Sequence, residues 1–198
     1  ERVRARTMAM QNSEELAETA SLLFKQFNEL VGLPDGSRTF ISIIDKSSAT
    51  VKVWMTLPDG KVRPGNHEVP LTQNDGLERV FQAWQKKEPL IIRDLEGKKL
   101  ADYIQFLSTL AHVPSDSGLN KMVKNKPTRL VFSEASCAYG LIGVMTQTPM
   151  EDGTLAILIR FAHVFEQTYR RFLDLENAEK QSRIIQAEND RKTKELGE

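Results

Sequence analysis

Cysteine is almost absent from this sequence of 198 residues, with Cys137 as its single example. One thiol excludes an internal disulfide and a metal site built from several thiolates, because both need two or more cysteines. Such sparse use is compatible with a reducing cytoplasm, where we expect the protein to lie. The three histidines, His67, His112 and His163, are far apart in the chain and none is paired at a four-residue spacing, so we expect no metal site.

Net charge and long apolar runs are also missing. The 27 basic residues balance the 27 acidic residues, so no overall field attracts nucleic acid or an anionic membrane. Lysine and arginine are interleaved with acids rather than gathered in a basic stripe, which also argues against nucleic-acid binding. No apolar run approaches the roughly 20 residues that cross a bilayer, and no signal peptide opens the chain. We therefore expect neither nucleic acid nor a membrane as a partner.

The sequence lacks the motifs of common catalytic sites. It has no glycine-rich phosphate loop and no serine in a G-x-S-x-G turn. Its carboxylate pairs, Asp94 with Glu96 and Glu151 with Asp152, lie at a strand end and in a loop, which are solvated settings. Cys137 beside a strand is more typical of a small packed side chain than of a reactive thiol. We expect no catalytic activity from this chain itself.

The C-terminal fifth organises the chain. Residues Gly153–Phe161, GTLAILIRF, are almost unbroken apolar and include β-branched side chains, which predicts a fully buried strand. From about His163 to Leu196 there is no glycine or proline, so we expect one long helix directly after that strand. The chain begins without Met and ends inside this charged helix, and we interpret it as part of a longer protein.

The predicted long helix carries a seven-residue repeat. Steps of three and four, the spacing of a coiled-coil seam, join Phe161, Val164, Thr168, Arg171, Leu175, Ala178, Ser182, Ile185, Asn189, Lys192 and Leu196. Only about half of these positions are apolar, so the helix would be marginal alone. A polar residue such as Asn189 costs stability but fixes register, which suits a relay helix that pairs with its twin. The alternative is a solvated, charged helix whose periodicity is accidental.

The other elements follow from periodicity and turn signals. A helix is predicted from about Arg2 to Val31, with a core-facing apolar stripe from Leu16 onward. Strands are predicted at 38–45, 49–57, 61–71, 89–95, 128–136 and 139–148, with a hairpin turn at 58–60. Helices are predicted from a capping box at 75–78, over 100–111 and, for a shorter one, over 119–123. The segment 38–45 is apolar on both faces, which predicts a central strand. In 49–57, Val53 and Met55 lie on the face opposite Trp54.

This order of elements predicts an α+β fold. A single antiparallel sheet would carry the long N- and C-terminal helices on one face and the middle helices on the other. We divide the chain into an N-terminal linker and bundle helix (1–31), a central domain (32–161) and a C-terminal coiled-coil helix (162–198).

A resemblance follows from this order and from two stretches of sequence. The early hairpin, the helices in the middle, the closing strands and the long exit helix resemble a GAF domain, a small sensory fold related to PAS. ERVRARTMAMQNSEELAETASLLFKQFNEL resembles the linker and first helix between modules of bacterial sensor histidine kinases, and YRRFLDLENAEKQSRIIQAE resembles their exit helix. The resemblance implies a cytoplasmic, dimerising sensor or relay module upstream of a kinase, cyclase or phosphatase output domain.

The chain departs from the ligand-binding subclasses of that family. Bilin-binding members carry Cys followed by His, whereas Cys137 precedes Ala138. The Asn-Lys-x-x-Phe-Asp signature of cyclic-nucleotide-binding members is absent, and members that reduce methionine sulfoxide use several cysteines. The sequence therefore predicts no particular cofactor.

A small-molecule site, if present, is expected between the sheet and the middle helices. Its predicted lining is Trp54, Phe106, His112, Arg129, Phe132 and Tyr139. An aromatic wall with one arginine and one histidine would suit an anionic or planar ligand. The competing interpretation is that these are ordinary core and edge residues around a filled interior.

Two functional classes stay open on the sequence. The first is a sensory or relay module in which a change in the domain shifts the pairing of the terminal helices. The second is a ligand-free dimerisation or scaffold module. Both predict a homodimer through the first and last helices, with contacts at Leu175, Ala178, Ser182, Ile185 and Asn189, and relay to a downstream domain favours parallel pairing.

Overall fold

The computed structural model describes residues 5, 15–56, 62–63, 68–110 and 127–196. Its helices are α2 (Leu16–Val31), α3 (Asp75–Gln85), α4 (Gly97–Thr109) and α6 (Asp152–Leu196). Its strands are β1 (Arg38–Asp45), β2 (Thr50–Thr56), β3 (Val62–Arg63), β4 (Glu68–Pro70), β5 (Leu90–Glu96), β6 (Arg129–Cys137) and β7 (Gly140–Thr146). This mixture confirms the predicted α+β class.

The strands form one antiparallel sheet. Their order is β3-β2-β1-β7-β6-β5, and the short β4 also pairs with β2. The central position predicted for β1 is confirmed, because β1 pairs with β2 on one side and β7 on the other. Phe40 and Ile41 are both buried, one in each of the two cores that cover the sheet.

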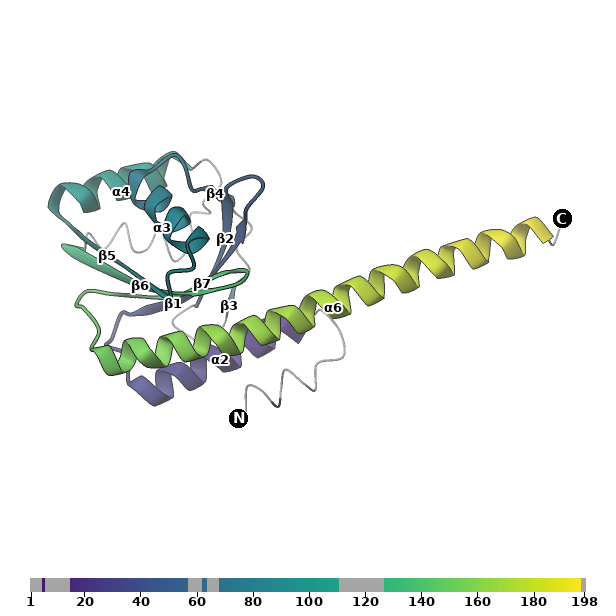
Figure 1. The fold of residues 1–198 in the computed structure, drawn as a ribbon, viewed down its shortest axis with the longest axis horizontal. Helices are drawn as coiled ribbons and strands as arrows, with labels where there is room; N and C mark the ends of the chain where they lie inside the picture. The colour runs from purple at the N-terminus through teal and green to yellow at the C-terminus, as the bar shows by residue number, and fades with distance from the viewer. Residues whose placement is uncertain (1–4, 6–14, 57–61, 64–67, 111–126, 197–198) are drawn as a thin grey trace.

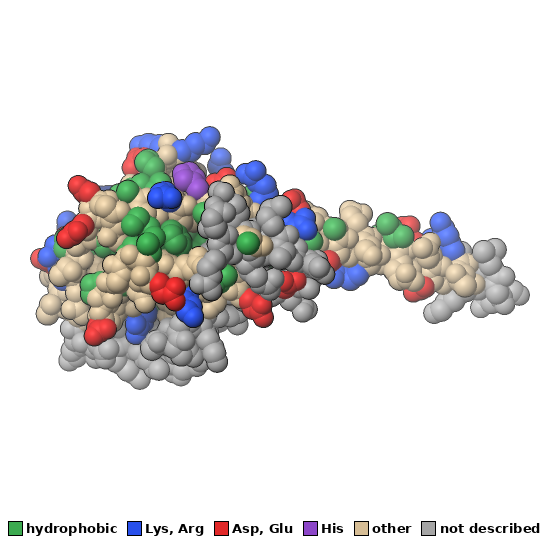
Figure 2. Space-filling model, turned by 90° about the horizontal axis from the view of Figure 1, so that it is seen from below, with side chains coloured by type: hydrophobic (Ala, Val, Ile, Leu, Met, Phe, Trp, Pro, Cys, Tyr) green, Lys and Arg blue, Asp and Glu red, His purple; other side chains and the backbone are tan. Residues whose placement is uncertain are grey.

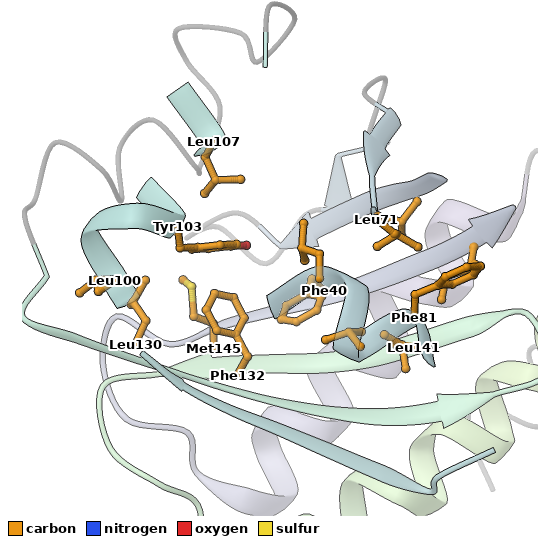
Figure 3. Close-up of a cluster of buried hydrophobic side chains, with 14 residues drawn as sticks. Phe40, Leu71, Phe81, Leu100, Tyr103, Leu107, Leu130, Phe132, Leu141 and Met145 are labelled. Atoms are coloured by element: carbon orange, nitrogen blue, oxygen red, sulfur yellow. The ribbon is translucent and has the colours of Figure 1, made fainter. Parts of the chain in front are cut away.

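Helices cover both faces of the sheet, as predicted (Figure 1). The middle-helix core lies under α3 and α4 and includes Leu77, Phe81, Leu100, Tyr103 and Leu107 with sheet residues such as Phe132 and Met145. Figure 3 shows the α4 side chains of Tyr103 and Leu107 directed at the sheet. The terminal-helix core lies under α2 and α6 and includes Leu23, Phe24, Phe27, Leu158, Ala162 and Phe165.

The prediction of a strand at Gly153–Phe161 is wrong, because α6 already begins at Asp152. Leu155, Leu158 and Ala162 are buried while Ala156 and Arg160 are exposed, which is the three-to-four spacing of a helix face. A short segment that is mostly apolar, such as this one, fits a buried strand and a buried helix equally well by periodicity. The closing part of the sheet therefore consists of β6 and β7 alone.

Helix α6 has two distinct halves. It spans 45 residues, or about 68 Å at 1.5 Å per residue. The first half packs on β6, β7 and α2, and the ring of Phe27 meets that of Phe161 edge-on at 5.2 Å. From Lys180 to Thr193 every side chain is exposed, and Figure 1 shows this part projecting beyond the domain.

The predicted start of α3 needs a small correction. The capping residue is Asn74, whose Oδ1 accepts hydrogen bonds from the N–H groups of Gly76 and Leu77. The sequence had indicated Asp75 in this role. The apolar stripe predicted for α3 is present, with Leu77, Val80 and Phe81 buried. The start of the N-terminal helix, the turn at 58–60, the helix near 119–123, His67 and His112 lie outside the described residues.

Candidate functional site

The residues predicted to line one ligand site do not share one face of the sheet. Phe106 and Phe132 lie with the middle-helix core, whereas Trp54 and Tyr139 pack against the terminal-helix core. The pleat explains the split, because Trp54 follows Val53 and successive side chains of a strand point to opposite faces. The prediction of a single aromatic wall containing all of them is therefore wrong. His112 lies outside the described residues.

Arg129, the predicted anion ligand, lies at the edge of the sheet and is bound to two acids. Its Nε and Nη2 donate to the carboxylate of Asp94 at 3.0 and 2.6 Å, and its Nε lies 2.7 Å from Glu96. The hydrogen bond from Arg129 lowers the pKa of the Asp94 carboxyl. Within the described structure, the charge of this guanidinium is balanced by the protein itself.

The most unusual polar group is a buried ion pair beneath the middle helices. Arg93 of β5 donates from Nε and Nη2 to the two carboxylate oxygens of Glu134 in β6, at 2.9 and 3.1 Å. The side chain of Arg93 is 11% exposed and that of Glu134 is 3% exposed. This bidentate geometry is the strongest form of such a contact, and burial removes most of the screening by water.

Aromatic rings enclose the guanidinium of Arg93. Its Cζ lies 4.2 Å from the ring centre of Phe132 and 5.5 Å from that of Tyr103. Burial alone would lower the pKa of Arg93, but the charge of Glu134 and the hydrogen bonds raise it overall. Burial raises the pKa of the Tyr103 hydroxyl, although Arg93 opposes that effect. Arg93 therefore stays charged in an otherwise apolar core.

A buried hydroxyl lies near this ion pair. Ser136 follows Glu134 by two positions on β6, so both side chains point to the same face of the sheet. The Oγ of Ser136 is buried and has no hydrogen-bond partner. Among the described strands β5 lies at the edge of the sheet, and an inward-facing charged residue such as Arg93 is a common feature of edge strands. The cluster thus has a structural role besides any capacity to receive a polar ligand.

The turn between β6 and β7 joins both helical layers. The indole Nε1 of Trp84, on α3, donates to the carbonyl oxygen of Cys137 at 2.9 Å. The N–H of Ala138 donates to Oε2 of Glu166, on α6, also at 2.9 Å. Since α3 and α6 cover opposite faces of the sheet, this turn is a physical link between them.

Aromatic contacts extend this link along α6. The ring of Tyr139 lies 5.1 Å from that of Tyr169, which in turn contacts Phe165 and Phe172 at 5.7 and 5.2 Å. Arg170 binds Glu166 at 3.1 Å within the same helix. Tyr139, predicted to line a ligand site, is therefore part of the contact between the sheet and α6.

The thiol of Cys137, at the end of β6, is free of any disulfide and buried. Burial raises the pKa of the Cys137 thiol to about 11, so the thiol is protonated near neutral pH. Among the described residues, no group of three or more histidine, cysteine, aspartate or glutamate side chains is arranged to hold a metal ion. Within the same residues, no helix has the length and apolar character needed to cross a membrane.

The predicted dimer positions lie where α6 leaves the domain. Leu175 is half-buried, whereas Ala178, Ser182, Ile185 and Asn189 are exposed. Ile184 and Ile185 are 46% and 56% exposed, large apolar side chains without a covering element in the described structure.

The site predicted from the sequence did not include Arg93, Glu134, Trp84 or Glu166. A signal for the ion pair was present, since a glutamate inside a strand predicted to be buried requires a partner. Arg93 lies two positions from both Ile91 and Leu95 of β5, and residues two apart in a strand point to the same face, which here is the side of the core. No local pattern could have paired Trp84 or Glu166 with the β6–β7 turn, because both contacts bridge distant parts of the chain.

A scan against models of protein families gave no match for this chain. A search of curated proteins likewise found no relative.

Proposed function

We propose that this chain is a cytoplasmic sensory or signal-relay module that dimerises through its terminal helices. It would pass a conformational change to a downstream output domain, and we propose that this domain belongs to a sensor histidine kinase. The observation that carries the proposal is the dual role of α6: one continuous helix forms part of the core on the sheet and also projects beyond the domain. A displacement of its packed half must move its projecting half. The antiparallel sheet with helices on both faces agrees with the GAF-like resemblance.

Among the described residues, the seam of α6 is exposed at Ala178, Ser182, Ile185 and Asn189, where a second copy could pack, whereas Thr168 in its first part is buried. Ile185 follows Leu158, which faces the sheet, by 27 positions (158 to 185). At about 100° per residue, this separation places Ile185 on roughly the opposite side of the helix axis. A partner helix would therefore approach from the side away from the sheet. Figure 2 shows hydrophobic side chains on this face, including some along the projecting part of α6.

The polar character of the seam suits a relay. Ser182 and Asn189 weaken the pairing that Leu175 and Ile185 provide, so two arrangements of the paired helices would differ by only a small free energy. A domain that changes shape could then select between them. Parallel pairing would bring two output domains together at the C-terminal ends.

Sedimentation of two neighbouring variants tests the dimer. Ile185→Asp places a charge in the seam, whereas Ile184→Asp places the same charge on an adjacent exposed residue outside it. We expect the wild type and Ile184→Asp to sediment as dimers at tens of micromolar and Ile185→Asp as a monomer. A monomeric wild type, or equal behaviour of the two variants, would refute pairing along this seam.

Native mass spectrometry tests for a ligand. The mass of the dimer without added ligand is compared with twice the mass of the denatured chain. An additional small mass would support a ligand-responsive sensor and give the ligand's class by its size. A mass of exactly two chains that a metabolite screen leaves unchanged would support either relay without a ligand or a scaffold.

A ligand-free dimerisation or scaffold module is the second candidate. The observation in its favour is that Glu134 already neutralises Arg93, and that Phe132 and Tyr103 already lie against its guanidinium. A scaffold would keep one fixed arrangement of α6. Distance measurements between spin labels on the two α6 helices would then give a single narrow distribution under all conditions, whereas a relay would give two.

A further inference from the structure

We propose that the peptide unit between Cys137 and Ala138 is the coupling point through which α3 controls α6. This inference rests on the proposed function, in which α6 carries the output. It names the residues by which a change in the middle-helix layer, on one face of the sheet, reaches the terminal-helix layer on the other.

The two hydrogen bonds at this turn involve a single peptide plane. The carbonyl oxygen of Cys137, which accepts from Trp84, and the N–H of Ala138, which donates to Glu166, belong to the same peptide bond. Because a peptide unit is planar and stiff, its C=O and N–H move together. A shift of the Trp84 indole therefore changes the direction of the Ala138 N–H, whose hydrogen bond Glu166 accepts.

Each end of the link is held firmly by its own helix. The indole of Trp84 stacks on Phe81 with ring centres 6.1 Å apart, and Pro89, just after α3, accepts a hydrogen bond from the N–H of Ser136 at 3.1 Å. On the other side, Arg170 holds the carboxylate of Glu166. The bond from Ala138 to this carboxylate is charge-assisted and so stronger than an ordinary one.

Contacts with β1 hold the turn between β6 and β7 in place, so a movement of Trp84 would rotate the peptide unit rather than displace the turn. The N–H of Ile44 donates to the carbonyl of Tyr139 at 3.0 Å. Gly140 has φ +151°, and a Cβ at this position would collide with the carbonyl oxygen of Ser42. Since these contacts stop the turn from sliding along the sheet, movement of Trp84 is expressed as rotation of the Cys137–Ala138 peptide.

Glu166 is well placed to transmit this rotation. It lies in the packed half of α6, just before Tyr169 and Phe172, after which the helix leaves the domain. A change at Glu166 therefore acts on the part of α6 that anchors the projecting seam.

The experiment is two-dimensional amide and indole NMR of the full chain with variants at each end of the link. The protein has two tryptophans, so each spectrum contains the Trp84 indole signal and, as an internal reference, that of Trp54. We expect Glu166→Gln to shift the Trp84 indole N–H, on the far face of the sheet, and to leave the Trp54 signal in place. The matched control Glu188→Gln, at an exposed position of α6, should move neither.

The reciprocal variant is Trp84→Phe, which removes the donor and keeps an aromatic ring on Phe81. We expect it to shift the Ala138 amide and to speed hydrogen exchange in the α6 segment around Glu166 about fivefold, as loss of one ordinary hydrogen bond would. The proposal is overturned if Glu166→Gln moves the Ala138 amide but leaves the Trp84 indole unchanged. It is overturned equally if Trp84→Phe leaves exchange in α6 at the wild-type rate.

These readouts do not depend on the oligomeric state. Sedimentation of the same samples reports separately whether α6 pairs. A monomer with an intact response at Trp84 would count against the proposed function alone, and a dimer without that response would count against the coupling alone.

Discussion

Arg93 and Glu134 bind each other side by side across the last two strands of the sheet, inside the core beneath α4. Their two hydrogen bonds, of 2.9 and 3.1 Å, attach the edge strand β5 to its neighbour β6. A buried ion pair of this kind gives little net stability compared with apolar side chains, but removing one partner leaves an uncompensated charge. The pair therefore constrains how this core can change.

Glu134→Gln should destabilise the fold strongly. The substitution keeps the volume of the side chain but leaves the buried charge of Arg93 unpaired, at a cost of about 3–5 kcal/mol. The free energy of unfolding, measured with urea, checks this value. The control is Arg129→Gln at the exposed edge pair, where we expect a loss of about 1 kcal/mol or less. The double variant Arg93→Met/Glu134→Leu should be more stable than Glu134→Gln, and a double variant no better than the single would contradict this explanation.

Gly140→Ala should destabilise the protein while Gly153→Ala should not. A methyl group at Gly140 would meet the carbonyl of Ser42, and φ of +151° strains any other residue, so we expect a loss of at least about 2 kcal/mol. Gly153 lies in the first turn of α6 with open space around it, and alanine there should raise stability by up to about 1 kcal/mol. Thermal unfolding of both variants tests the positions together. A destabilising Gly153→Ala would argue against the helical assignment of this segment.

The Cys137 thiol should make stability fall in alkaline solution. Burial raises its pKa in the folded protein to about 11, above the 9.0 of an exposed thiol. Between these values the unfolded chain loses the proton and the folded chain retains it, so the unfolded state is favoured as pH rises. We expect the full contribution below pH 9 and a loss on the order of 2 kcal/mol by pH 11, relative to Cys137→Ala. Urea denaturation of both proteins at pH 8 and 11 measures the difference. If the wild type and Cys137→Ala lose the same free energy of unfolding between these pH values, the thiol does not titrate in this way.

Asn74→Ala should cost about 1 kcal/mol, the usual value of an N-cap side chain. Its Oδ1 satisfies the N–H groups of Gly76 and Leu77 at the start of α3. Asp75→Asn is the matched control, since the described side-chain capping bonds come from Asn74. Equal losses for the two variants would place the cap at both residues.

The local periodicity of the sequence was enough for much of the fold. Alternation in β2 separated Val53 from Trp54, and the stripe of α3 predicted which residues face the sheet, because side-chain direction in regular structure depends only on nearby residues. The apolar character of β1 on both faces was enough to predict its central place. The residues of the candidate site were harder to predict from the sequence. Trp54 and Phe132 were predicted to line the same wall, but they lie on opposite faces of the sheet.

Two features were decided only when the chain packed. The segment Gly153–Phe161 is apolar enough for strand or helix, and packing rather than local propensity decided between them, since Leu158 lies in the terminal-helix core with sheet residues such as Ile142 and Val144. Arg93 and Glu134 are 41 residues apart, and Trp84 and Cys137 are 53 apart, so each pairing depends on which strands become neighbours. By itself the sequence determined the elements other than Gly153–Phe161 and the faces that they bury, because these follow from short-range periodicity. The tertiary structure decided the ion pair and the link between α3 and α6, because long-range contacts exist only once the sheet has brought distant residues together.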